Sequence, residues 1–166
     1  MTKSSDYESA MLEAFIGKPE KTEYYRNIFA KYSVNGVDRI MWNWNYWAAF
    51  GGIFFFLYRK LYIEAGVIFL INLAAASTLS IIGWTIIGIL MGGYGSYFVY
   101  KRYNKVKLNI ENSTADETKR IGAMRVYGGV NQWVIWAGAA ASILTLIGIL
   151  ISGMFISGVF SGLSNG

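Results

Sequence analysis

Hydrophobic and charged positions are segregated along the chain. The charged side chains fall in three blocks, residues 3–39, 59–64 and 101–125. The runs between and after these blocks carry no charge and cover residues 40–58, 65–100 and 126–166. A soluble amphipathic helix would place charged side chains on its solvent face at every turn. Apolar runs of about 18 residues or more are typical of transmembrane helices. The pattern therefore predicts an all-α integral membrane protein.

The polar N-terminal segment, residues 1–39, predicts a cytoplasmic arm of two short amphipathic helices. Ser5 and Glu8 have the spacing of a capping box at the start of the first helix. Gly17 suits the end of that helix, and Pro19 suits the start of the next. The second helix is expected to place Tyr24, Ile28 and Tyr32, with Tyr25 and Phe29 beside them, on one stripe, followed by a turn at Asn35-Gly36. The apolar faces of the two helices would pack on each other or on the bilayer, with a partner-binding surface as the alternative.

The uncharged run at residues 65–100, within a predicted membrane segment of residues 64–100, is too long for one span. As a single helix it would measure about 54 Å, whereas the hydrocarbon core is about 30 Å thick. A break near residues 80–84, where a glycine and a tryptophan follow each other, predicts a tight transmembrane hairpin. Residues 101–125 then form a basic cytoplasmic loop, and 126–166 form a C-terminal transmembrane helix with a Gly/Ser-rich tail.

Residues 40–63 are rich in aromatic and amide side chains and contain the pair Gly51-Gly52. Trp and Tyr prefer the membrane interface, and a glycine pair lets the backbone turn. This composition predicts an interfacial or re-entrant helix, with a full span as the alternative. Glu64 follows Lys60 at the spacing of an ion pair along one helix face.

The distribution of positive charge decides between topologies. If 40–58 does not cross, all 15 Lys and Arg residues lie on one side of the membrane. If it crosses together with both hairpin arms, nine lie outside and six inside. A third arrangement, with 40–58 crossing and 65–100 spanning only once, leaves two outside. The positive-inside rule favours the first arrangement. We therefore expect a multi-pass protein of the bacterial inner membrane with a cytoplasmic N-terminus and a periplasmic C-terminus.

The composition speaks against enzymatic chemistry. The chain contains no Cys and no His, which removes thiolate and imidazole ligands and the usual general base. We expect no catalytic, metal-binding or cofactor-binding residues and no cofactor. The net charge of the chain is +5, and its positively charged residues flank the apolar runs. We therefore expect the lipid bilayer as a partner rather than nucleic acid.

Small residues four apart in the apolar runs predict close helix packing. The rows are Gly88, Gly92 and Ser96 in the hairpin, and Gly153, Ser157, Gly158 and Gly162 in the last run. The simplest expectation is that the hairpin packs against the last helix. Contact with a second copy or with an unidentified membrane protein is the alternative.

Residues 15–105 resemble a family of small bacterial inner-membrane proteins of unknown function, the YigF/YigG type. Its most specific segments are Trp42-Asn43-Trp44, Ala49-Phe50-Gly51, and Tyr58-Arg59-Lys60 followed by Tyr62. The resemblance implies the same membrane location and implies no activity, substrate or cofactor. The remainder of the chain lies outside it.

Three functions are compatible with these features. The first is a non-enzymatic membrane interaction or scaffold subunit, indicated by the small-residue faces and the amphipathic arm. The second is a component of an oligomeric channel or transporter, with Asn72, Ser77, Thr78 and Thr85 along a polar path. The third is a protein that senses anionic lipids through its basic helix ends.

Overall fold

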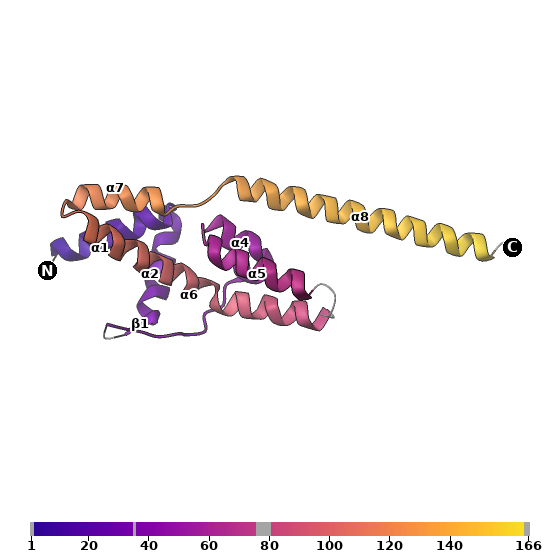
Figure 1. The fold of residues 1–166 in the computed structure, drawn as a ribbon, viewed down its shortest axis with the longest axis horizontal. Coiled ribbons are helices and arrows are strands. Elements are labelled where there is room, and N and C mark those ends of the chain that lie inside the picture. Colours follow the sequence, from indigo (N-terminus) through magenta and orange to yellow (C-terminus); the bar gives the residue numbers. More distant parts are fainter. Residues whose placement is uncertain (1, 35, 76–80, 165–166) are drawn as a thin grey trace. The chain divides into compact units, whose positions relative to one another are not determined.

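The structure is a computed structural model that describes residues 2–34, 36–75 and 81–164. The chain divides into two units, Met1–Asn131 and Gln132–Gly166, which are described separately. The elements of the first unit are α1 (Thr2–Ile16), α2 (Pro19–Tyr32), β1 (Ser33–Val34), β2 (Val37–Asp38), α3 (Tyr46–Gly51), α4 (Ile53–Tyr58), α5 (Tyr62–Ala75), α6 (Ile81–Ser113) and α7 (Glu117–Tyr127). The second unit contains α8 (Trp133–Ser164). Helices thus dominate the described residues, as predicted, and a small β-hairpin is added (Figure 1).

The two helices of the N-terminal segment are confirmed, with changes in detail. Gly17 ends α1 in a left-handed conformation, with φ of +64°, and Pro19 opens α2. Of the turn predicted at Asn35-Gly36, residue 35 lies outside the described residues, and Gly36 lies between β1 and β2, which pair in antiparallel register. The capping box is wrong, because α1 begins at Thr2 and Ser5 lies inside it. The stripe is confirmed except at Tyr24, which is 43% exposed, whereas its other four members are buried.

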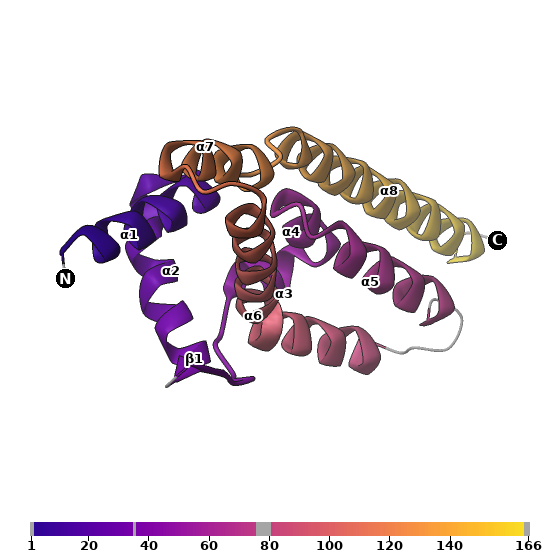
Figure 2. The same cartoon turned by 60° about the vertical axis from the view of Figure 1, so that its left-hand side comes forward.

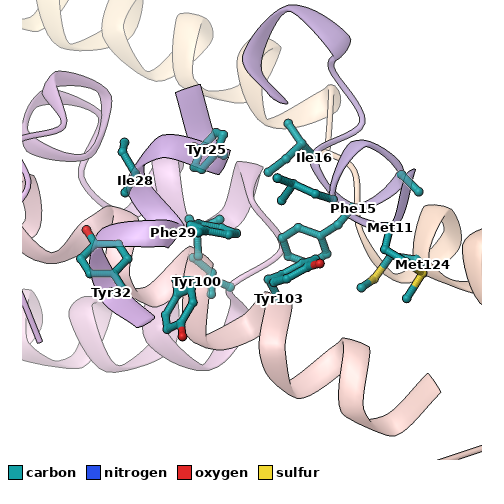
Figure 3. Close-up of a cluster of buried hydrophobic side chains, with 14 of the residues drawn as sticks. Met11, Phe15, Ile16, Tyr25, Ile28, Phe29, Tyr32, Tyr100, Tyr103 and Met124 are labelled. Carbon is teal, nitrogen blue, oxygen red and sulfur yellow. The ribbon is translucent and has the colours of Figure 1, made fainter. Parts of the chain in front are cut away.

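The apolar faces of α1 and α2 enter a common core with α6 and α7 (Figure 3). The ring of Phe15 packs edge-on against Tyr103, with centroids 5.3 Å apart, and Phe29 packs in the same way on Tyr100. Met124 of α7 is fully buried within this core. The apolar faces of α1 and α2 therefore pack on each other, as predicted. Helices α6 and α7 bury the remainder of these faces.

Residues 101–125 are mostly helical and not an irregular loop. Helix α6 continues without interruption to Ser113, and α7 begins after the N-cap Asp116, whose side chain accepts from the backbone N–H groups of Thr118 and Lys119. The reason lies in the apolar spacing, because Tyr103 and Ile110 fall on the buried face of α6. The charged residues between them occupy the other faces of the same helix.

The segment at 40–58 forms no continuous helix. An extended stretch leads into α3, and Gly52, with φ of +50°, separates α3 from α4. Each of these helices has six residues, or about 9 Å, far short of the hydrocarbon thickness. The glycine pair therefore breaks the helix, as its flexibility predicted.

The two arms of the predicted hairpin are α5 and α6, but they do not pack tightly on each other. Among the described residues, α5 packs mainly on α4, and the first half of α6 packs on α3. Figure 2 shows α5 and α6 as separate arms. Of the predicted break near 80–84, residue 80 lies outside the described residues, while 81–84 already belong to α6. The two arms therefore pack on the short helices α3 and α4 and not directly on each other.

Two helices are long and apolar enough to cross a membrane, Ile82–Ser113 and Trp133–Met154. A shorter apolar helix covers Tyr62–Ala74. Helix α8 is uncharged on all sides, and its helical conformation continues through the predicted Gly/Ser-rich tail to Ser164. An all-α chain with two candidate spans is therefore established.

Candidate functional site

The first of the family-like motifs, Trp42-Asn43-Trp44, lies in a non-helical stretch against one face of α6. The backbone N–H of Asn43 donates to the carbonyl oxygen of Gly93 at 3.0 Å, and that of Asn45 donates to Gly92 at 2.8 Å. These carbonyls belong to a helix, and a carbonyl oxygen has two lone pairs, so each can accept a second donor. The motif is therefore held to α6 by its backbone.

Asn45 is the polar centre of this contact and was missed by the sequence-based prediction. It is buried, and its side-chain Nδ2 donates to Ser96 Oγ at 3.1 Å. Its Oδ1 accepts from the backbone N–H of Ala48 at 3.2 Å and so caps the start of α3. The available signal was an asparagine directly before a short apolar run, which is typical of an N-cap.

Glycines on α6 make the close approach possible. A Cβ atom at Gly92 would lie 2.8 Å from the Cβ of Ala49, and one at Gly95 would lie 2.5 Å from the Cβ of Ala48. At Gly93 it would lie 2.4 Å from the ring of Trp42. Only a residue without a side chain fits at these three positions.

The predicted row of Gly88, Gly92 and Ser96 is thus a packing face, and its partner within the first unit is the segment 42–49. This contact was not predicted from the sequence, and the packing of the hairpin on the last helix stays a prediction. Gly93 and Gly95 lie off the four-residue spacing and were missed. They are needed because an extended chain with aromatic rings covers a wider strip than a helix does. Helix α8 carries the second predicted row, Gly153, Ser157, Gly158 and Gly162. The surroundings of the last three residues lie outside the described part of the chain.

The remaining motif residues divide into an inner and an outer set. Ala48 is fully buried against α6, while Trp47 is 77% exposed and Phe50 is 85% exposed. Tyr46 is also exposed. The α3 helix therefore presents small side chains to α6 and large aromatic side chains to its surroundings.

The segment 38–59 travels along α6 and returns. At its start, Asp38 accepts a hydrogen bond from the Tyr100 hydroxyl. It then contacts Gly92 and approaches Gly88 through Ala49. On the way back, Phe56 packs on Phe98, with ring centroids 5.9 Å apart. Both ends of the segment consequently lie near the same level of α6, about 15–18 Å from the turning point at Gly88.

Arg59, in the second motif, has a structural environment that its sequence did not reveal. It is only 8% exposed, and its Nη1 donates to the carbonyl oxygen of Ile16 at 3.3 Å, at the end of α1. Its guanidinium lies over the ring of Tyr25, 4.6 Å from the centroid. A cation at a helix C-terminus is favoured by the helix dipole. Burial raises the pKa of the Tyr25 hydroxyl, and the nearby Arg59 opposes that effect only in part.

Lys60 and Arg102 act in the same way at the end of α7. Lys60 adopts a left-handed backbone conformation, with φ of +58°, and its Nζ donates to the carbonyl oxygens of Val126 and Gly128. Arg102 donates to the carbonyl oxygen of Tyr127 at 3.0 Å. The predicted Lys60–Glu64 ion pair is wrong, because Lys60 turns toward α7 and its ammonium group is used there.

The turn after α4 also holds the chain that follows α7. The backbone N–H of Asn131 donates to Tyr58 at 2.9 Å, and its side-chain Nδ2 donates to the Leu57 carbonyl and the Tyr62 hydroxyl. The Gly129 N–H donates to the carbonyl oxygen of Phe15 at 2.7 Å. Residues 57–62 are therefore a junction, which we call the basic turn, between α1, α5 and α7.

The described residues contain no group of three acidic side chains that could hold a metal ion. The surface of the described residues includes the following two depressions. One of about 390 Å³ lies between α1 and α7, beside Glu13 and Arg125. The other, of about 380 Å³, lies between α3 and α6 and is mainly apolar. The geometry therefore favours packing and apolar contact.

A protein-family model described as "Protein of unknown function (DUF2628)" matches residues 5–105. No curated protein and no solved structure matches the chain. The matched region contains the segment 38–59, the face of α6 that carries Gly92, Gly93 and Gly95, and the basic turn. Helix α7, which the basic turn caps, lies outside it.

Proposed function

The chain belongs to the DUF2628 family, whose function is unknown, and from its geometry we propose that it is an integral membrane protein that acts as a non-enzymatic interaction or scaffold subunit. The observation that carries the proposal is the separation of its surface into charged and apolar regions. The charged side chains lie within residues 3–39, 59–64 and 101–125, so that α5 carries a single charge, Glu64 in its first turn. The first half of α6, together with α5, has an apolar surface.

Large apolar side chains are exposed along both arms. On α5 they include Ile63, Val67, Leu70 and Leu73, and on α6 they include Ile82, Ile86, Ile89 and Leu90. Soluble monomers rarely expose contiguous apolar surfaces of this kind. A bilayer would cover them, and α8, which is apolar on all sides, would be a further span.

The path of segment 38–59 supports a topology in which this segment enters one leaflet and returns. Its two ends lie near the level of Tyr100, where the positive residues of the second half of α6 begin. With this path, the N-terminal helices, the basic turn and residues 101–125 share one side, which the positive-inside rule assigns to the cytoplasm. The C-terminus is then periplasmic, and the membrane is the bacterial inner membrane.

A scaffold role is supported by two features of the chain. It lacks Cys and His, so the commonest nucleophile–base pairs are unavailable. It has small-residue rows on α8, which allow close contact with a second copy or another membrane helix. No cofactor is part of the proposal.

Two experiments test the proposal. Membranes of cells that produce the full chain are washed with alkaline carbonate, and the chain should stay in the pellet, as an integral protein does. Recovery in the wash would refute the membrane assignment. A photo-crosslinking residue at Leu146 of α8, in native membranes, should then yield a discrete dimer or partner adduct. Monomer alone, with the same residue placed at Ile135 also unreactive, would refute the scaffold role.

A channel or transporter component is the second candidate. The observation that favours it is the side-chain oxygen of Asn72 on α5, which is buried and has no hydrogen-bond partner among the described residues. In an oligomer, this amide could face a polar path. Ion flux through liposomes containing the purified chain, lost on Asn72→Leu and retained on Leu73→Asn, would favour the channel over the scaffold.

A further inference from the structure

We propose that the groove between α3 and α6 binds one anionic phospholipid, with an acyl chain in the groove and the headgroup beside Lys31, Arg39 and Lys101. This inference rests on the membrane location proposed above. Its occupant is a lipid of the surrounding leaflet rather than a second protein chain.

The groove is apolar and open to the surroundings. Its walls are the side chains of Trp44 and Phe50 on one side and of Trp84 and Ile89 on the other, with Gly88 as its floor. A Cβ atom at Gly88 would meet only the carbonyl oxygen of Ala49, at 3.5 Å, which is an ordinary contact. The space above the glycine is therefore free for a flexible apolar chain, in a part of α6 that lies within a candidate span.

Aromatic rings extend from the groove toward the charged end of α6. The rings of Trp44 and Trp42 are stacked, with centroids 6.2 Å apart, and Trp42 packs edge-on against Tyr94 at 5.3 Å. Trp and Tyr rings are enriched at the level of lipid headgroups. This strip therefore matches the zone between acyl chains and headgroups.

Three cationic residues lie close in the chain or in space to Tyr32 and Tyr97, whose ring centroids are 5.3 Å apart at the far end of the strip. Lys31 precedes Tyr32, the backbone N–H of Arg39 donates to the Tyr32 carbonyl, and the Lys101 ammonium lies 6.0 Å from the Tyr97 ring centroid. Within the described residues, no ion pair engages any of these three cations. The nearby Asp38 carboxylate accepts from Tyr100. An excess of positive charge thus remains for a phosphate group.

The order of these features matches the shape of a phospholipid. Residues 39–45 form neither helix nor strand, and even a fully extended chain would separate Arg39 and Trp44 by at most about 17 Å. Over that distance the surface changes from cationic through aromatic to apolar. Charge complementarity selects an anionic headgroup, and the apolar groove selects an acyl chain.

The first test compares two glycine substitutions in the full chain. Gly88→Leu fills the groove, whereas Gly66→Leu adds the same side chain on α5, where nothing lies within 4 Å. Both proteins, purified in mild detergent, are titrated with palmitoyl-oleoyl phosphatidylglycerol, and bound lipid is counted by native mass spectrometry. We expect one tightly bound lipid in the unaltered chain and in Gly66→Leu, and at least tenfold weaker binding in Gly88→Leu. Equal lipid binding by all three proteins would overturn the proposal that the groove holds the acyl chain.

The headgroup is tested by Arg39→Gln combined with Lys101→Gln. We expect the preference for phosphatidylglycerol over phosphatidylcholine to fall by at least fivefold, while Lys21→Gln combined with Lys105→Gln leaves it unchanged. An equal effect of both pairs would mean that general surface charge, and not this site, selects the lipid.

A third measurement needs no substitution. The unaltered chain in vesicles that contain phosphatidylglycerol with a diazirine on its acyl chain is irradiated and digested, and labelled peptides are identified. Labels should be enriched at residues 44–50 and 84–89 relative to α5. Labels on α5 and α8 only would overturn the lipid site while leaving the membrane location intact. Absence of label everywhere, with the chain outside the vesicles, would overturn both proposals.

Discussion

At the scale of single residues, the contact between α3 and α6 depends on missing side chains. Gly92, Gly93 and Gly95 lie against atoms that a Cβ would approach to less than 3 Å. Protein interiors are close-packed, so an added methyl group must displace its neighbours. Spacing in the sequence indicated a small-residue face but not its partner, because the partner is an extended segment some fifty residues earlier.

Gly95→Ala should therefore destabilise the first unit. The new methyl group would lie 2.5 Å from the Cβ of Ala48, and overpacking of this kind costs about 1–3 kcal/mol. This exceeds the gain in helix propensity, about 1 kcal/mol at most. The matched control is Gly122→Ala in α7, where nothing lies within 4 Å and a small gain is expected. Thermal unfolding in detergent measures both, and equal midpoints for the two variants would show that the close approach is not needed.

Arg59→Lys tests the buried cation. Lysine keeps the charge but loses the planar group that lies over Tyr25 and donates to Ile16, so we expect a loss of about 1–2 kcal/mol. Arg26→Lys is the control, because Arg26 pairs with Glu23 on an exposed face, where such pairs contribute about 0–1 kcal/mol. Unfolding midpoints should fall clearly for Arg59→Lys only. A similar small change in both would mean that Arg59 contributes its charge alone.

Stability should also fall at alkaline pH because of Tyr25. Burial raises the pKa of this hydroxyl in the folded state above its ordinary value near 10. Above pH 10 the unfolded state therefore loses a proton that the folded state retains. Unfolding then becomes more favourable as pH rises toward the folded-state pKa, while below pH 10 this contribution is constant. Tyr25→Phe should reduce the decline between pH 9 and 11, and Tyr24→Phe, at an exposed neighbour, should not. Identical pH profiles for the unaltered chain and Tyr25→Phe would contradict this assignment.

At the scale of secondary-structure elements, local signals predicted the positions of several helix ends. Gly17, Pro19 and Gly52 act where they were expected, because backbone freedom and a missing N–H are properties of one residue. The sequence-based prediction ended the second hairpin arm at residue 100, where a charged stretch begins, whereas α6 continues to Ser113. The spacing of Tyr103 and Ile110 indicated a buried face in that stretch. The roles of Arg59, Lys60 and Arg102 were beyond prediction, because the carbonyl groups that they satisfy belong to helices distant in sequence.

The return of segment 38–59 toward its starting level predicts the accessibility of the basic turn. The chain has no native cysteine, so each variant carries one thiol. Lys60→Cys should react with a membrane-impermeant maleimide only when the cytoplasmic side is open, as should the reference variants Glu20→Cys and Lys105→Cys. A cysteine appended after Gly166 should react from the periplasmic side. Labelling of position 60 from the periplasm would show that 40–58 crosses.

At the scale of the whole molecule, some of the segregated positive charges stabilise the fold, in addition to indicating an orientation in the membrane. Three of the cations that suggested an orientation, Arg59, Lys60 and Arg102, also donate to backbone carbonyl oxygens at the ends of α1 and α7. One set of residues can serve both purposes, because helix C-termini and the cytoplasmic leaflet each attract positive charge. The family-matched region ends at residue 105, yet its core is completed by Met124 of α7.

Removal of the second unit should therefore leave a folded membrane protein. A chain that ends at Asn131 keeps α7, the basic turn and the apolar surfaces of α5 and α6, so we expect it to resist carbonate extraction and to unfold cooperatively. A chain that ends at Thr114 loses α7 and uncovers the core around Met11 and Phe15. Since burying a methionine fully contributes about 1.5–3 kcal/mol, this shorter chain should have a clearly lower unfolding midpoint. Carbonate extraction and thermal unfolding of both truncations check the expectation. Release of the longer truncation into the soluble fraction would mean that α8 alone holds the protein in the membrane.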